Sequence, residues 1–149
     1  MLIETKAMGS VEIVEKQIIH VAQGFYGFED YSGFALIDAP QKPFILIQCI
    51  EKKDLAFLAI DPFLFRTDYE IDIEDSVLSS LGIDSATDVV VLALVTVPTD
   101  GGPVTANLQG PLVINRKNNE AFQAILTDPR WRTKHDIVAE SAARKASQC

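Results

Sequence analysis

Short extended segments make up most of the chain, and they constrain its fold more than any other feature. Each is rich in apolar, often β-branched residues and is bounded by glycine, proline, asparagine or aspartate, as strands between turns are. The candidate strands are residues 2–7, 11–14, 17–21, 34–38, 44–50, 55–60, 89–97, 105–108, 111–115 and 121–126. This spacing predicts an all-β, mainly antiparallel domain, either a small barrel-like fold or a sandwich. Closing the sheet would also hide its edges.

One or two short helices are expected beside the strands. Asp72, or one of the acids after it, can cap a helix whose Val77, Leu78 and Leu81 share one face. Gly82 then supplies the left-handed residue that ends it.

The length of 149 residues predicts one domain over residues 1–149. We expect its core to span about residues 2–127, with residues 128–149 as a C-terminal segment that is helical or frayed. The helix candidate there covers residues 136–146, where Ile137 and Val138 meet several alanines. Arg144 and Lys145 stand near its end, which is favourable to the helix dipole.

The sequence also predicts where the protein works. The longest apolar run, residues 89–95, is about a third of the roughly 20 residues that a bilayer helix needs. Residues 1–6 alternate like a strand and lack the pattern of a signal peptide. Cys49 and Cys149 make a poor disulfide pair for a domain of this size, which favours the reducing cytoplasm. We expect Cys49 to be a small buried hydrophobe and Cys149 to be a loose end.

A search for catalytic chemistry finds no assembled site. His20 and His135 do not stand in metal-ligand spacing, and neither a nucleophile elbow nor a phosphate loop occurs. Asp54 and Asp61 could form a carboxylate pair, but an Asp-Pro step at a strand end is more often a turn-forming cap. We therefore expect no enzymatic activity, no cofactor and no metal site.

Negative charge is concentrated in residues 54–88. Nine of the 21 acidic residues lie there and only Arg66 opposes them, so this window alone carries the −8 net charge of the chain. Aromatic and apolar residues interrupt the acids, as they would not in a disordered tail. The window therefore predicts an acidic, aromatic-studded surface on a folded domain. Such a surface suits a basic protein partner and opposes nucleic acid by the same field.

Two segments are candidates for contact with partners. In the first, Pro62 ends a strand and Phe63 and Phe65 follow at alternate positions, so one ring should point away from the core if the other is buried. The residues assigned to this protein-binding surface are Asp61, Pro62, Phe63, Phe65, Tyr69, Glu70, Asp72, Glu74 and Asp75. The second segment is the glycine loop of residues 24–30, whose rings either fold onto the core or form a contact surface. The candidate second surface comprises Phe25, Tyr26, Phe28 and Asn107.

Several of these segments, taken in order, resemble the FliW family of flagellar assembly factors. The matching segments are Ile3-Glu4-Thr5, Gly24-Phe25-Tyr26-Gly27-Phe28-Glu29, Asp54-Leu55-Ala56-Phe57, Asp61-Pro62-Phe63, Thr96-Val97-Pro98, residues 105–115 and Gln123-Ala124-Ile125-Leu126. The chain departs from the family where Ala22 and Tyr26 replace a usual proline and where residues 131–136 replace Tyr-Ser-Thr-Arg-His-Pro.

The resemblance implies a small all-β cytoplasmic protein without enzymatic activity. It implies that the protein binds flagellin and, when free of flagellin, binds the carbon storage regulator CsrA, a small basic dimer that represses flagellin translation on messenger RNA. A −8 protein docked beside an RNA site repels phosphates and can expel RNA without competing for its contacts. We expect a monomer that binds neither nucleic acid nor membrane. The alternative is a β-barrel that binds a small ligand, although the sequence shows no convergent polar set for one.

Overall fold

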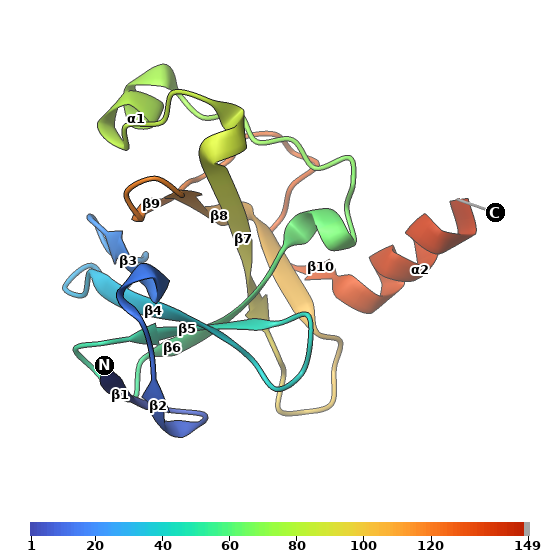
Figure 1. Ribbon diagram of the computed structural model, residues 1–149. Helices are drawn as coiled ribbons and strands as arrows, with labels where there is room; N and C mark the ends of the chain where they lie inside the picture. Colours follow the sequence, from blue (N-terminus) through green and yellow to red (C-terminus); the bar gives the residue numbers. More distant parts are fainter. Residues whose placement is uncertain (148–149) are drawn as a thin grey trace.

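The computed structural model describes residues 1–147, so Cys149 lies outside the described residues. Two strands near the N-terminus, β1 (Leu2–Thr5) and β2 (Gly9–Glu12), form an antiparallel hairpin of their own. The following strands are β3 (Ile18–Val21), β4 (Gly33–Asp38), β5 (Ile45–Cys49), β6 (Ala56–Ile60), β7 (Val89–Thr96), β8 (Thr105–Asn115), β9 (Glu120–Gln123) and β10 (His135–Asp136). They form one sheet in the order β10-β8-β7-β6-β5-β4-β3-β9 (Figure 1).

A second pairing of β9, with β8, closes seven of these strands into a barrel. All pairings are antiparallel except that of β3 with β9, where His20 stands opposite Glu120 and Val21 opposite Ala121. The prediction of an all-β, mainly antiparallel fold is confirmed, and the structure is a barrel and not a sandwich.

Strand β8 replaces two predicted strands, residues 105–108 and 111–115. It is continuous, but its register with β7 shifts: Leu92 stands opposite Leu112, whereas Leu94 stands opposite Asn107. The extra residues form a bulge, and the Asn107 Oδ1 accepts hydrogen bonds from the backbone N–H groups of Gln109 (3.0 Å) and Gly110 (2.8 Å) there. The turn residues that predicted a break between strands therefore mark a bulge within one strand.

The interior of the barrel and an outer layer are separate parts of the core. Phe25, Phe34 and Leu112 lie in the interior with Ile47 and Cys49, all close to fully buried. A second cluster, which includes Val113, Leu108 and Trp131, covers the outer face of β7 and β8. Residues 61–73 and 124–137 supply much of that layer, which explains why the end of β8 is apolar on both faces.

Residues 1–147 contain two α-helices, close to the predicted positions. Helix α1 (Asp75–Ser80) starts after Glu74 and not after Asp72. Gly82 has a φ of +71°, and the N–H of Ile83 donates to the carbonyl of Leu78 at 2.9 Å, the bond that defines a Schellman end. Helix α2 (Ile137–Ser147) extends from the barrel beyond β10 (Figure 1).

Candidate protein-docking surface

The candidate surface begins where β6 ends and the chain crosses outside β7. The Asp61 Oδ1 accepts a hydrogen bond from the Phe63 N–H at 3.0 Å and so caps a single 3-10 turn, Pro62–Leu64. Pro62 and Phe65 are buried, whereas the Phe63 side chain is 41% exposed. One ring is therefore buried and the other is exposed, as their alternate spacing predicted, and the exposed Phe63 ring lies 5.8 Å from that of Tyr69.

Tyr69 fixes the next part of this segment to the barrel. Its side chain is 4% exposed, and its hydroxyl donates a hydrogen bond to the Leu108 carbonyl at 2.6 Å. Burial raises the pKa of this hydroxyl well above its ordinary value, so it stays a donor. Tyr69 is thus a core residue that supports the surface from beneath, although the sequence assigned it to the contact surface.

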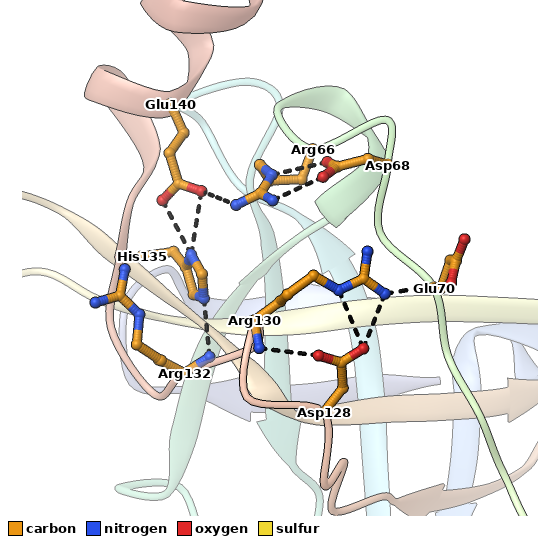
Figure 2. A network of polar contacts seen from close by, with 8 residues as sticks. All are labelled: Arg66, Asp68, Glu70, Asp128, Arg130, Arg132, His135 and Glu140. Atoms are coloured by element: carbon orange, nitrogen blue, oxygen red, sulfur yellow. Dashed lines mark hydrogen bonds and ion pairs between the residues drawn. The ribbon is translucent and has the colours of Figure 1, made fainter.

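Trp131 packs beneath the same segment, between two arginines. The guanidinium of Arg66 lies 4.9 Å from the ring centroid and that of Arg130 lies 4.8 Å from it, and Tyr69 meets the indole edge-on at 4.8 Å. Each arginine is held by carboxylates, as Figure 2 shows: Arg130 bonds to Asp128 and Glu70, and Arg66 bonds to Asp68 and to Glu140 of α2.

These contacts change the pKa values of carboxylates that bind the two arginines. The hydrogen bonds from Arg66 lower the pKa of Asp68, and those from Arg130 lower the pKa of Asp128. Both carboxylates therefore stay ionised and paired at neutral pH.

His135 belongs to this network and has a structural part in it. Its side chain is 1% exposed, its Nδ1 lies 3.1 Å from both carboxylate oxygens of Glu140, and its Nε2 accepts the backbone N–H of Arg132 at 2.9 Å (Figure 2). Because Nε2 is an acceptor, the ring proton lies on Nδ1 and donates to Glu140. The imidazole thereby ties the start of α2 to the segment that carries Trp131.

The network divides the acids of the window into two kinds. Asp68 and Glu70 are paired with arginines, and Asp88 is paired with Lys117 at 3.2 Å. Asp72, Glu74, Asp75 and Asp84 are exposed, and none of them forms an ion pair with another residue in the part described. Three of the nine acids of the window are therefore paired with a base, which reduces its uncompensated negative charge below what the sequence count suggested.

Two grooves flank the segment that carries these free acids. The first, which we call the acidic groove, has a volume of about 800 Å³ and is lined by Glu70, Asp72, Glu74, Tyr26, Ile125 and Trp131, among others. The second, the apolar groove, has a volume of about 420 Å³ and is lined by Phe63, Ile71, Ile73, Leu78, Ile83 and Val91, with Asp72 and Asp84 beside them. Asp72 and Ile73 contribute to both grooves, so residues 70–74 are the wall between them.

The glycine loop contributes one residue to the acidic groove. Tyr26 lines it, is 58% exposed, and donates its backbone N–H to the Gln123 Oε1 at 3.0 Å. Phe25 is buried in the barrel, and the ring of Phe28 packs edge-on against Phe57 at 5.5 Å. A Cβ on Gly24 would lie 2.6 Å from the Glu29 Cα, so no side chain fits there.

The structure thus brings together residues that the sequence assigned to separate surfaces. Glu70, Asp72 and Glu74 from one set meet Tyr26 from the other in the acidic groove, whereas Phe63 faces the apolar groove. The sequence analysis did not identify Trp131, Arg130 or Ile125. Ile125 could have been found, because it is an apolar residue on the outward side of a strand end.

Membrane-spanning helices and clusters of metal-binding side chains are both absent from the described residues. No helix there is long and apolar enough to cross a membrane, and no group of three or more His, Cys, Asp or Glu side chains could hold a metal ion. Cys49 is a free thiol that is fully buried in the barrel, as predicted.

Comparisons with known proteins give a consistent result. The model of the FliW protein family matches residues 2–137. The flagellar assembly factor FliW of Treponema denticola is 56% identical over 140 residues, covering 94% of this chain and 95% of that protein. The protein of the same name from Treponema pallidum is 56% identical over 148 residues, covering 99% of each chain. A crystal structure of the flagellar assembly factor FliW is similar with a TM-score of 0.84 at 38% identity, covering 92% of this chain and 96% of that one.

Proposed function

The chain belongs to the FliW family of flagellar assembly factors, and we propose that it acts as a cytoplasmic, non-enzymatic regulator that binds flagellin and antagonises CsrA. In this proposal the protein is a monomer, it binds neither nucleic acid nor membrane, and only its free form binds CsrA. Flagellin then controls how much antagonist is available, which is a linkage between two binding equilibria.

One observation carries the proposal: the exposed Phe63 ring lines the apolar groove beside the unpaired Asp72 and Asp84. An aromatic side chain next to a groove with a charged rim is the composition of a protein-binding hot spot. The negative rim favours a basic partner, and CsrA is such a partner. Phe65 is buried, so Phe63 is the anchor that we propose.

The free acids also support a mechanism for RNA release. Glu74 and Asp75 lie at the start of α1 and have no ion pair among the described residues. If CsrA docks on the apolar groove, these carboxylates repel RNA phosphates within about 8 Å, the Debye length in physiological salt. RNA release then depends on charge near the docked regulator as well as on occupancy.

The packing of the barrel favours this function over small-ligand binding. Phe25, Phe34, Ile47 and Leu112 fill the interior and are each at most 1% exposed. A ligand-binding barrel instead keeps a cavity inside. The grooves described above lie outside the barrel, where a protein partner can reach them.

A ternary assay tests the mechanism. Labelled RNA is bound to CsrA, and the double variant Glu74→Gln, Asp75→Asn is added at saturating concentration. We expect it to bind CsrA nearly as well as the parent protein does but to displace less RNA. Neutralising Asp54, an exposed acid at the opposite end of β6, is the matched control and should leave displacement unchanged.

Equal displacement by the parent and the double variant at saturation would rule out electrostatic repulsion. A separate titration with flagellin and with CsrA tests the proposed partners themselves, since a barrel for small ligands should bind neither.

A further inference from the structure

The acidic groove lies along an unpaired backbone edge. This edge belongs to the chain that follows β9, beyond the point where β9 pairs with β3. Strand β3 pairs with β9 only at Glu120 and Ala121. Beyond this point the chain after β9 stays bonded to β8 on its other side: the Ala124 N–H donates to the Pro111 carbonyl at 2.8 Å and the Leu126 N–H to the Gln109 carbonyl at 2.7 Å. Residues 122–127 are thus paired with β8 on one side, whereas β3 no longer pairs with them on the other side.

The backbone groups on the open side have no partner. Because Ala124 and Leu126 direct their N–H groups toward β8, those of Ile125 and Thr127 point the opposite way. In the part of the chain that is described, no hydrogen bond joins the backbone of Ile125 or Thr127 to another residue. The open side lines the acidic groove, because Ile125, Thr127 and Tyr26, which follows β3, all do so.

The rest of the groove favours a basic chain with apolar side chains. Asp72 and Glu74 line the same groove and have no ion pairs in the described chain. Ile125 and Tyr26 are each 58% exposed. Trp131 also lines the groove, and its ring is 1% exposed.

We propose that the acidic groove binds an extended, basic peptide segment of a partner protein, which adds as a strand to the open edge at residues 123–127. The backbone of the peptide pairs with Ile125 and Thr127, and its lysine or arginine side chains meet Asp72 and Glu74. This is strand addition to an exposed sheet edge, in which main-chain bonds give affinity and side-chain contacts give selectivity. It rests on the proposed function only in taking the partner to be a protein, since it uses neither Phe63 nor the apolar groove.

The test uses the whole chain and an acetylated, amidated heptapeptide of alternating valine and lysine. We expect saturable binding that weakens as salt rises, and slower hydrogen exchange at the amides of Ile125 and Thr127 in the complex. A peptide N-methylated at alternate residues keeps its charge but loses one hydrogen-bonding edge, so it should bind at least tenfold more weakly. Replacing lysine with glutamate should abolish binding.

Variants of the protein distinguish the contribution of the backbone edge to peptide binding from the contribution of the acidic side chains. Ile125→Pro removes the free N–H without removing a bond to β8, and it should weaken the peptide by about five- to tenfold, the effect of one lost hydrogen bond or slightly more. Ile125→Thr keeps the N–H and is the matched control. Asp72→Asn with Glu74→Gln should flatten the salt dependence, and Phe63→Ala should bind the peptide as the parent does.

Three results would overturn the proposal. They are no binding of the lysine peptide, equal binding of the N-methylated peptide, and unchanged exchange at Ile125 and Thr127 in the complex. If hydrogen exchange at Ile125 and Thr127 slows as the concentration of the protein is raised without peptide, the edge binds a second copy of the chain instead. The peptide results are independent of CsrA and flagellin, so they can fail while the proposed function holds, and the reverse.

Discussion

The two grooves share a wall, but they differ in how a partner can be held. The apolar groove offers side chains, chiefly Phe63 with the isoleucines at 71 and 73, and the charged residues that line it are Asp72 and Asp84. The acidic groove offers free backbone groups at Ile125 and Thr127 beside unpaired carboxylates. The comparison teaches that one acidic stretch of sequence can border two different surfaces: Glu70 and Glu74 line only the acidic groove, Ile71 lines only the apolar groove, and Asp72 and Ile73 line both.

The largest effect is expected beneath the acidic groove. Trp131→Ala should lower the free energy of unfolding by about 3–5 kcal/mol, because it removes a buried ring on which Tyr69 and two arginines pack. Urea denaturation followed by circular dichroism measures this, with Val138→Ala on the exposed side of α2 as the control. A loss below about 1 kcal/mol would mean that the floor of the groove is not a structural element.

The next largest effect is a loss of CsrA binding, which we expect from a variant in the apolar groove but not from one in the acidic groove. Phe63→Ala should weaken CsrA binding by about 2 kcal/mol, as the loss of an aromatic anchor does, with little loss of stability because the ring is 41% exposed. Tyr26→Ala, an exposed aromatic in the other groove, is the matched control and should leave CsrA binding unchanged. Calorimetric titration measures the affinity of both variants for CsrA. If Tyr26→Ala weakens binding and Phe63→Ala does not, the assignment of CsrA to the apolar groove is wrong.

A smaller effect should separate the shared wall from the rest of the acidic window. Asp72→Lys should weaken CsrA binding by less than about 1 kcal/mol, mainly through a slower association rate that depends on salt. Asp54→Lys changes the net charge equally at the far end of β6 and should have a weaker effect. Stopped-flow association at two salt concentrations distinguishes them, and equal slopes would show that only net charge matters.

The smallest effect concerns the paired acids. The pKa of Asp68 is lowered in the folded protein, chiefly by its hydrogen bonds from Arg66, so this pair stabilises the fold above the ordinary aspartate pKa of about 3.9. The contribution is lost as the pH falls from that value through the lower pKa of the folded state. Because Asp68 is more than half exposed, solvent keeps the contribution well under 1 kcal/mol.

Unfolding of the parent and of Asp68→Asn at pH 3 to 6 tests this sign. The stability difference between them should shrink toward the acid end. A difference that grows on acidification would contradict it.

Much of the fold could be predicted, because its signals are local. Strand positions follow from short apolar runs between turn residues, and the end of α1 follows from Gly82. The burial of one of Phe63 and Phe65 and the exposure of the other likewise agree with their spacing. The bulge in β8 carries the same turn residues as a break between strands, so the sequence alone could not separate the two.

The site was less predictable, because its pairings are distant in sequence. Glu70 meets Arg130 across 60 positions and Arg66 meets Glu140 across 74. The charge count of residues 54–88 could not show that Arg130 and Lys117, which lie outside the window, neutralise two of its acids. The open edge at Ile125 depends in the same way on where β3 leaves β9, which no local pattern encodes.

The parallel pairing of β3 with β9 also bears on how the protein is made. Asn119 has a φ of +59°, and its side chain donates to the carbonyls of Lys16 and Ile18, about a hundred positions earlier in the chain. While a ribosome is still synthesising residues before Asn119, β3 has no partner on that side and its edge is open to other chains. Closure must then wait for the end of the barrel to emerge. Because contacts so far apart in sequence form slowly, ring closure is the step at which a nascent chain is most exposed to misassembly.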